Sequence, residues 1–195
     1  QMLGSIEVVC GGMFSGKTEE LIRRLKRAQI GRQPVQVFKP DIDDRYDKDA
    51  ICSHSGGKFD SYPIKDVSHI VDLLQDRTRV VGIDEAQFFS NEIVDIVNKL
   101  ADRGLRIIIA GLDMDYLGQP FGPMPQLMAI ADEVVKLRAV CVVCGSPACR
   151  SHRLTDDEEK VLVGVTEYEP RCRIHHGLKS KYFRGFSNDG RPIST

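Results

Sequence analysis

Apolar and polar positions alternate in two distinct patterns along the first two-thirds of this chain. Near-continuous apolar runs predict strands that are buried on both faces, at residues 6–10, 34–38, 80–83, 105–110 and 134–140. Apolar residues spaced three or four positions apart predict helices at residues 19–25, 66–75, 92–100 and 126–131. Strands and helices that alternate in this order predict an α/β fold with a parallel sheet.

The pattern changes twice along the chain. Residues 41–57 are polar and rich in Asp, Ser and Gly, which predicts a loop with one short strand. From Cys141 onward the chain is rich in Cys, His and charged residues, with a single strand-like run at residues 161–165. We therefore expect a core domain, a smaller second domain and a flexible tail, which cover residues 1–139, 140–178 and 179–195.

Composition narrows the class of protein. Of 195 residues, 27 are Lys or Arg and 28 are Asp or Glu, so charge gives no reason to expect nucleic acid or an acidic membrane as a partner. No apolar run is long enough to cross a bilayer, and the first residues lack the pattern of a secretory signal. Six cysteines in a chain of this length do not form a disulfide scaffold. These features predict a cytoplasmic protein.

The first candidate site is a phosphate-binding loop between a predicted strand and a predicted helix. Residues 11–18 fit the pattern G-x-x-x-x-G-K-[ST], with Gly11, Gly12, Met13, Phe14, Ser15, Gly16, Lys17 and Thr18. Glycines let the backbone N–H groups point at phosphate oxygens, and the following helix directs its positive end at the same phosphates. In this pattern Lys17 reaches the β- and γ-phosphates, and the Thr18 hydroxyl binds Mg²⁺.

A second candidate site follows the buried strand at residues 80–83. An apolar strand that delivers Asp84 to the Mg²⁺ near a phosphate-binding loop is the Walker B arrangement. The adjacent Glu85 can accept a proton from an attacking hydroxyl, and it is our candidate general base. An ordinary charged loop start would also explain the pair, but the phosphate-binding loop upstream favours the functional interpretation.

The third candidate site is a zinc site. Cys141-x-x-Cys144 has the spacing of a zinc knuckle, and two C-x-x-H pairs could complete four ligands: Cys149 with His152, and Cys172 with His175. The first pair leaves a tight loop, whereas the second closes a long loop that has little core of its own. We favour the second pair.

Other interpretations of these cysteines and histidines stay open from the sequence. Free buried thiols are one alternative, Cys149 is a rival ligand, and His176 is a fallback ligand beside His175. For Cys10 and Cys52, which lie outside the cluster, we expect packing in the core.

Together these motifs resemble the zinc-containing thymidine kinases, which have a RecA-like P-loop NTPase core and a small zinc-binding lasso domain. The matching stretches are GGMFSGKT at 11–18, FKPDIDDRY at 38–46, SHSGG at 53–57, GIDEAQFF at 82–89, GLDMDYLGQPFG at 111–122, KLRAVCVVCGSPA at 136–148 and VGVTEYEPRCRIHH at 163–176. The resemblance implies transfer of the γ-phosphoryl group of ATP to the 5′-hydroxyl of thymidine, with deoxyuridine as a further acceptor.

The resemblance also implies roles for individual residues. It gives catalysis to Glu85 and Arg45, and ATP binding to residues 11–18 with Asp84, Glu85, Ala86 and Gln87. The implied nucleoside-binding residues are Met13, Asp43, Phe88, Leu112, Tyr116, Phe121, Val161, Val163, Gly164, Val165 and Tyr168. The implied zinc ligands are Cys141, Cys144, Cys172 and His175, and those of Mg²⁺ are Thr18 and Asp84.

The same resemblance implies a homotetramer and feedback inhibition by thymidine triphosphate. The sequence departs from the family pattern in a shorter segment at residues 153–161 and in Cys149, where the family more often has a small hydroxyl residue. A nucleic-acid-dependent ATPase with a zinc module is the alternative. The balanced charge, the short chain and the lack of a second motor domain argue against it.

Overall fold

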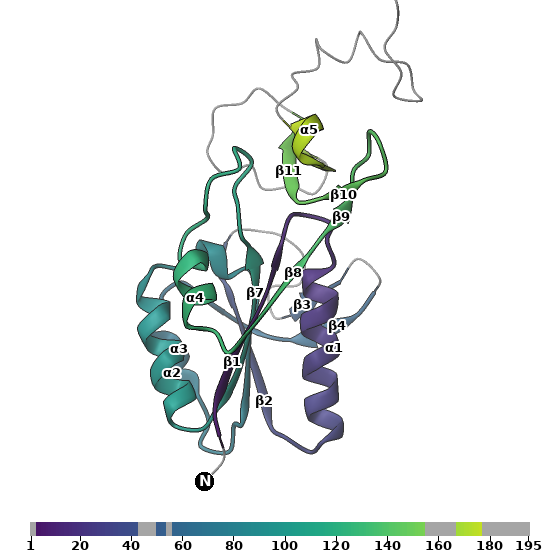
Figure 1. Cartoon of the computed structure of the whole chain (residues 1–195). Helices are drawn as coiled ribbons and strands as arrows, with labels where there is room; N and C mark the ends of the chain where they lie inside the picture. The colour runs from purple at the N-terminus through teal and green to yellow at the C-terminus, as the bar shows by residue number, and fades with distance from the viewer. Residues whose placement is uncertain (1–2, 43–49, 54–55, 155–166, 177–195) are drawn as a thin grey trace, which may run out of the picture.

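The computed structural model describes residues 3–42, 50–53, 56–154 and 167–176. Its centre is a sheet of six strands, all parallel, in the order β5-β2-β6-β7-β1-β8 (Figure 1). The strands are β1 (Ser5–Gly11), β2 (Val35–Pro40), β5 (Tyr62–Ile64), β6 (Val80–Ile83), β7 (Arg106–Leu112) and β8 (Glu133–Leu137). The α/β fold with a parallel sheet is therefore confirmed.

Helices cover both faces of this sheet. Alternate residues of β7 supply the two cores, with Ile107 and Ile109 on one face and Ile108 and Ala110 on the other. The second face packs against α1 (Lys17–Ile30), and the first packs against α2 (His69–Leu73), α3 (Glu92–Asp102) and α4 (Met124–Ile130) (Figure 1). Because both faces are covered, the central strands are apolar throughout, as the sequence pattern indicated.

A small module follows the sheet, and we call its described residues, 139–154 and 167–176, the Cys/His module. It contains β9 (Ala139–Val140) paired with β10 (Pro147–Ala148), β11 (Arg150–Arg153) paired with β12 (Tyr168–Arg171), and α5 (Arg173–His176). The module lies beyond the carboxyl ends of the sheet strands, above the loop that follows β1 (Figure 1). A separate hairpin of β3 (Ala50–Cys52) and β4 (Lys58–Asp60) lies beside α1.

The predicted helix at residues 66–75 is shorter in the structure, and side chains explain both ends. Asp66 Oδ1 accepts hydrogen bonds from Ser68 N and Oγ at 2.8 and 2.6 Å, which forms a turn before α2 begins. At the other end, Gln36 Nε2 donates to Leu73 O at 3.0 Å and Gln36 Oε1 accepts from Gln75 N at 2.8 Å. Gln36 therefore satisfies the backbone groups that another helical turn would have used.

Two strand predictions also needed correction. The run at residues 134–140 is not one strand, because β8 ends at Leu137 and β9 belongs to the Cys/His module. The edge strand β5 was not predicted, and its central residue is Pro63, which the sequence pattern associates with turns. The Tyr62 ring stacks on Phe38 of β2 with centroids 5.5 Å apart, so tertiary packing places this short segment in the sheet.

The two cysteines outside the cluster behave differently from each other. Cys10 is fully buried in the core, as predicted, but Cys52 is exposed on β3, so the prediction of core packing was wrong for Cys52. In α4, Leu127 is fully buried, and Met128 and Ile130 pack against the same core. The predicted strand at residues 161–165 and the tail at 179–195 lie outside the described residues.

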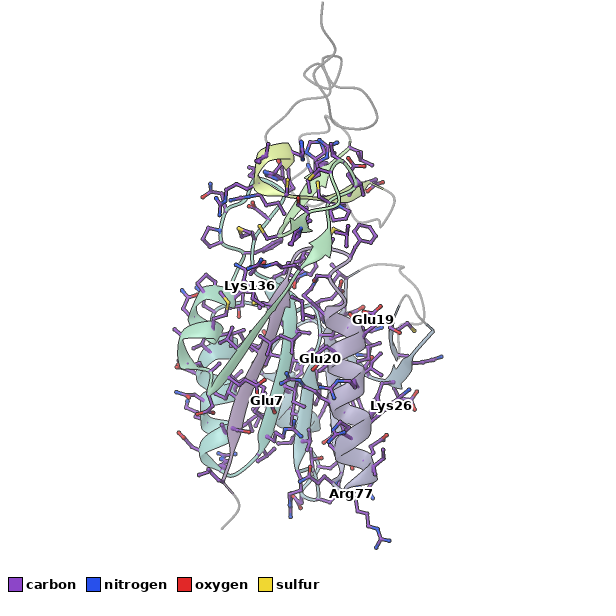
Figure 2. The ribbon with its side chains drawn as sticks, turned by 45° about the vertical axis from the view of Figure 1, so that its right-hand side comes forward. Glu7, Glu19, Glu20, Lys26, Arg77 and Lys136 are labelled. Carbon is purple, nitrogen blue, oxygen red and sulfur yellow. The ribbon has the colours of Figure 1, made fainter. Side chains whose placement is uncertain are left out.

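A buried ion network fixes α1 against the sheet. Glu7 of β1 accepts hydrogen bonds from Arg24 of α1, at 2.7 Å, and from Arg106 of β7. Arg24 also pairs with Glu20 at 2.8 Å and with Glu133 of β8 at 2.9 Å. Figure 2 labels Glu7 on the sheet and Glu20 on the side of α1 that is nearer the sheet. Because α1 follows the phosphate-binding loop, these contacts also help to fix the position of that loop.

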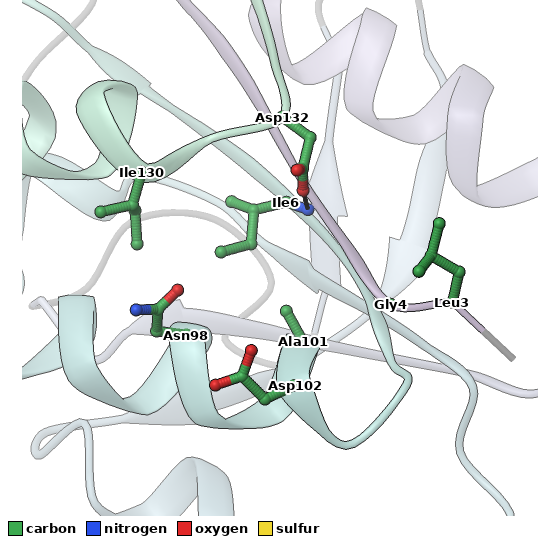
Figure 3. A pocket seen from close by; sticks show the side chains of 8 residues that line it. All are labelled: Leu3, Gly4, Ile6, Asn98, Ala101, Asp102, Ile130 and Asp132. Atoms are coloured by element: carbon green, nitrogen blue, oxygen red, sulfur yellow. Dashed lines mark hydrogen bonds between the residues drawn. The ribbon is translucent and has the colours of Figure 1, made fainter. Parts of the chain in front are cut away.

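A hollow of about 540 Å³ lies at the amino ends of the strands, lined by residues that include Ile6, Asn98 and Asp132 (Figure 3). Asp132 Oδ2 accepts a hydrogen bond from Ile6 N at 2.8 Å in its wall. The hollow is at the opposite end of the strands from the carboxyl ends, where the candidate site lies. Within the described part of the chain, no helix is long and apolar enough to cross a membrane.

Candidate active site

The strand register brings two of the predicted motifs to the same edge of the sheet. Cys10 of β1 pairs with Gly111 of β7, and Ile83 of β6 pairs with Ile109 of β7. The loop after β1 and the Asp84 that follows β6 therefore lie at neighbouring carboxyl ends, separated by one strand. Ligands of open parallel sheets bind at this edge.

The loop at residues 11–18 has the conformation of a phosphate cradle. Phe14 and Gly16 have positive φ angles of 63° and 86°, which turn the backbone sharply before α1 starts at Lys17. Ser15 Oγ and Lys17 Nζ both donate to Gly12 O, each at 2.7 Å. The amino end of a 14-residue helix thus faces the loop, and its N–H groups suit an anionic ligand.

Asp84 lies against the start of this helix. Its Oδ2 accepts a hydrogen bond from Thr18 Oγ1 at 3.1 Å, and its Oδ1 accepts one from Glu85 N at 2.9 Å. Asp84 is only 6% exposed, and burial raises the pKa of its carboxyl group above the ordinary value. Burial lowers the pKa of the Lys17 ammonium, and the negative charge of Asp84 opposes that shift.

The oxygens of Thr18 and Asp84 fit the donor chemistry of Mg²⁺. This ion prefers hard oxygen ligands and is usually held by one or two carboxylates together with substrate phosphates. The hydroxyl and the carboxylate come from different elements and are within hydrogen-bonding distance of each other. A buried carboxylate beside a phosphate cradle gains a favourable partner when such a cation is bound.

Glu85 has a left-handed backbone conformation, with φ 50° and ψ 41°. A residue other than glycine in this region is strained, and such strain occurs preferentially at functional sites. The conformation turns the chain directly from Asp84 into the short helix η1 (Ala86–Phe88). Two consecutive carboxylates are thereby directed differently, and Glu85 remains partly exposed while Asp84 is buried.

The segment after Glu85 is packed against the end of β7. Gln87 is buried and its Oε1 accepts a hydrogen bond from Leu112 N at 3.0 Å. The rings of Phe88 and Phe121 make an edge-to-face contact with centroids 5.6 Å apart. The two predicted stretches at 82–89 and 111–122 are therefore in contact. Ala86 is fully buried in the core of the sheet.

Two tyrosines of the predicted site lie close to Arg153. The Arg153 guanidinium carbon is 3.8 Å from the centroid of the Tyr116 ring and 5.7 Å from that of the Tyr168 ring. Arg153 Nη2 also donates to the Tyr168 hydroxyl at 3.2 Å. Tyr116 and Tyr168 come from distant parts of the chain. Both lie near Arg153, which contacts the Tyr116 ring and pairs with Tyr168 across β11 and β12.

The Cys/His module also contacts the phosphate-binding loop directly. Met13 N donates to Ser151 Oγ at 3.0 Å, and a Cβ on Gly12 would lie 3.4 Å from Cys149 O. Ser151 and Arg153 were not predicted as site residues. No local pattern marks them, because their importance arises from the alternation of β11, which directs both toward the core domain.

Cys141, Cys144, Cys172 and His175 form a compact cluster, with four ligand atoms within 4.8 Å of one another. The separations are 3.7 Å from Cys141 Sγ to His175 Nδ1, 3.8 Å from Cys144 Sγ to Cys172 Sγ, and 3.2 Å from Cys172 Sγ to His175 Nδ1. Ligands of a tetrahedral zinc ion with Zn–S bonds near 2.3 Å are separated by roughly 3.7 Å. The donor set therefore fits a structural zinc ion.

The electrostatics of this cluster agree with metal binding. Hydrogen bonds from Ser146 lower the pKa of the exposed Cys144 thiol to about 7, which increases the fraction of thiolate at neutral pH. Burial raises the pKa of Cys172. A bound cation would favour the thiolate form of every cysteine in the cluster.

The alternative ligands are directed elsewhere. Cys149 and His152 are not among the four clustered residues. His152 Nδ1 lies 3.1 Å from His176 O, and His176 Nε2 lies 2.7 Å from Tyr116 O, so His176 is not a fallback ligand. The predicted residues Asp43, Arg45, Val161, Val163, Gly164 and Val165 lie outside the described residues.

We compared the chain with known protein families and proteins. A family model described as thymidine kinase matches residues 4–176. A thymidine kinase of Bdellovibrio bacteriovorus is 58% identical over 173 residues, which cover 88% of this chain and 85% of the relative. A thymidine kinase of Bacteroides thetaiotaomicron is 53% identical over 191 residues, which cover 97% of this chain and 92% of that relative.

Among solved structures, domain III of the Thermotoga maritima replication initiation protein DnaA can be superimposed on part of the chain. The TM-score is 0.43 at 16% sequence identity, with 69% of this chain and 55% of the other covered. Similarity at this level does not establish a shared fold.

Proposed function

This chain belongs to the thymidine kinase family and acts as an ATP-dependent nucleoside kinase on thymidine, and we propose how its residues carry out the reaction. The observation that supports the proposal most strongly is the juxtaposition of Thr18 and Asp84, 3.1 Å apart, with Glu85 next in the chain. It places a cation site and a candidate base at the end of the phosphate cradle.

The donor half of the site holds ATP. Backbone N–H groups of residues 11–18 and the ammonium of Lys17 bind the phosphates, and Asp84 and Glu85 line the same side. Ala86 and Gln87 are buried behind them. Thr18 and Asp84 would hold Mg²⁺, and the bound ion would neutralise part of the phosphate charge. Lys17 exchanges its contact with Gly12 O for a phosphate oxygen, and phosphate charge favours its protonated form.

The chemical step needs a base near the acceptor. Glu85 takes the proton from the thymidine 5′-hydroxyl, and the oxygen attacks the γ-phosphorus of ATP. The bond from that phosphorus to the β-phosphate oxygen breaks, and ADP leaves with the electron pair. Arg45 stabilises charge that develops on the transferring group, and Asp43 lies near it, according to the family resemblance alone.

The acceptor half of the site is apolar and aromatic. Met13, Leu112, Phe88 and Phe121 enclose the nucleoside, and Tyr116 and Tyr168 contribute rings. The lasso residues Val161, Val163, Gly164 and Val165 read the thymine edge through backbone groups. Hydrogen bonds of this kind reject an analogue that cannot make them, and closure of the lasso excludes water as a competing acceptor.

We also propose the remaining features that the family resemblance implies. Zinc at Cys141, Cys144, Cys172 and His175 fixes the small domain, which covers residues 140–178 and follows a core domain at 1–139. The protein works as a cytoplasmic homotetramer and is inhibited by thymidine triphosphate. Deoxyuridine is a second acceptor.

The direct test incubates the protein with ATP, Mg²⁺ and a panel of nucleosides and analyses the products by chromatography. We expect thymidine monophosphate and ADP in equal amounts, with slower formation of deoxyuridine monophosphate. Addition of single-stranded DNA without nucleoside is the control for the alternative function. ATP hydrolysis that is stimulated by DNA, without formation of a nucleoside monophosphate, would contradict the proposal. The relatives, which are thymidine kinases, do not favour that alternative.

A further inference from the structure

We propose that His176 is a positioning residue that connects the metal-bearing helix α5 to Tyr116, and so sets the position of the nucleoside-stacking ring. This inference rests on the proposed function, because it assumes that Tyr116 contacts the nucleoside. It assigns to the zinc site a role in the alignment of the acceptor half-site, in addition to the ordering of its own domain.

The central contact is a hydrogen bond of 2.7 Å between His176 Nε2 and Tyr116 O. A carbonyl oxygen can only accept, so Nε2 must carry the proton and donate. The two residues are 60 positions apart, and the bond joins the Cys/His module to the turn after β7. His175, the preceding residue, places its Nδ1 in the metal cluster. Consecutive histidines of α5 therefore serve the metal and the turn.

The turn that carries Tyr116 is otherwise held largely by its own residues. Asp115 N donates to Gln119 O at 2.8 Å, and Asp115 Oδ1 accepts from Leu117 N and Gln119 N at 2.9 Å each. These bonds fix the shape of the turn. They do not fix its orientation relative to the phosphate-binding loop, which requires contacts with another part of the molecule.

Two further contacts from the same module act on this turn. The Arg153 guanidinium lies over the face of the Tyr116 ring at 3.8 Å, and Arg150 Nη1 approaches Met114 Sδ at 4.0 Å. Gly118 has a φ of 76°, which suits glycine, and a Cβ there would lie 2.1 Å from Arg150 Nη1. The turn therefore packs directly against the arginines of β11.

The same strand contacts the donor side of the site. Ser151, between those two arginines, accepts the hydrogen bond from Met13 N in the phosphate-binding loop. β11 therefore lies between the ATP cradle and the Tyr116 turn and contacts both. α5 contacts the same turn through His176, so a metal ion bound at the cluster would fix α5 and, through it, the separation of donor and acceptor.

Backbone contacts also keep His176 in place. His152 Nδ1 lies 3.1 Å from His176 O, and because this oxygen accepts, His152 is the donor. The two imidazole rings meet edge to face, with centroids 6.1 Å apart. His152 belongs to β11, so the strand and the helix are connected at the same point where the helix reaches Tyr116.

The experiment compares zinc-loaded wild type with His176→Ala and His176→Gln, since a glutamine amide can donate from nearly the position of Nε2. Ile174→Ala is the matched control, because Ile174 lies on the same helix and is 76% exposed. For each protein, zinc content, thymidine affinity by calorimetry, and KM for thymidine and for ATP are measured.

We expect His176→Ala to raise the Kd and KM for thymidine about fivefold to tenfold, the effect of one lost hydrogen bond. The KM for ATP should change less than about twofold, and zinc content should equal that of wild type. His176→Gln should recover most of the thymidine affinity, and Ile174→Ala should resemble wild type.

Four results would overturn the inference: unchanged thymidine affinity in His176→Ala, loss of zinc from it, an equal rise in both KM values, or no recovery in His176→Gln. Failure of the proposed function itself would look different. In that case wild-type protein would not form thymidine monophosphate, whatever the variants do.

Discussion

Glu85 shows at the scale of one residue how local strain and chemistry coincide. Its left-handed backbone, with φ 50°, costs the folded protein on the order of 1 kcal/mol or more. The same conformation separates its carboxylate from that of Asp84, which is turned toward Thr18. The pair can then divide the work, with one carboxylate for a cation and the other for a proton.

Replacement of Glu85 by Gln should therefore abolish transfer and leave the fold intact. We expect kcat to fall by about 100-fold or more, because the amide cannot take the hydroxyl proton. The Kd for ATP should stay close to that of wild type, as measured by calorimetry. Glu92→Gln, at an exposed carboxylate on α3, is the control. Turnover near the wild-type rate in Glu85→Gln would remove this residue from the role of base.

At the scale of elements, the way α1 packs on the sheet determines where the phosphate-binding loop lies. Leu25 of α1 is fully buried and packs above Gly82 of β6. A Cβ on Gly82 would lie 3.0 Å from both Leu25 Cδ1 and Cδ2, so helix and strand approach as closely as a glycine permits. Arg24 adds its pairs with Glu7 and Glu133 on the same side.

We expect Gly82→Ala to reduce the free energy of unfolding by about 1–3 kcal/mol, through overpacking against Leu25. Urea denaturation followed by circular dichroism measures the change. Leu25→Val removes the δ-carbons that the new methyl group would meet. The double variant should thus lose less stability than the sum of the two single changes. Strict additivity would show that the two side chains do not interact.

At the scale of the whole molecule, one cluster of side chains connects two distant parts of the chain. Cys141 and Cys144 precede β10, whereas Cys172 and His175 follow β12. Their approach closes the loop between residues 144 and 172, which includes β11 with Arg153 and Ser151. The proposed acceptor side would therefore depend for its geometry on a site that contacts neither proposed substrate.

Cys172→Ser and Cys149→Ser form a matched pair that tests this dependence. We expect Cys172→Ser to lose zinc and to reduce kcat/KM for thymidine at least about tenfold, because β12 and α5 lose their anchor. Cys149→Ser should retain zinc and most of the activity. Zinc content by atomic emission and steady-state kinetics measure the two effects. Zinc loss in Cys149→Ser alone would favour the shorter ligand pair.

The sequence by itself determined those features that depend on local pattern and spacing. Apolar runs specified the central strands, with β6 predicted residue for residue at 80–83. The spacing of residues 11–18 and of the Asp84–Glu85 pair predicted a phosphate cradle and a candidate base, and the structure brings the two motifs together. Loop closure favoured Cys172 and His175 over the nearer pair, in agreement with the observed cluster. These signals are legible because backbone periodicity and ligand number act over short stretches.

Only the tertiary structure decided which distant residues meet. Gln36, which lies on β2, ends α2 by binding backbone groups at its carboxyl end. Tyr62 stacks on Phe38 and brings β5 into the sheet, although Pro63 disfavours strand structure locally. Arg153 carries no motif and the sequence offered His176 only as a fallback zinc ligand, yet both contact Tyr116. Such contacts depend on the register of β11 with β12 and on the place of α5. The strand register and the position of α5 are set by packing over the whole chain, so no short stretch of sequence predicts them.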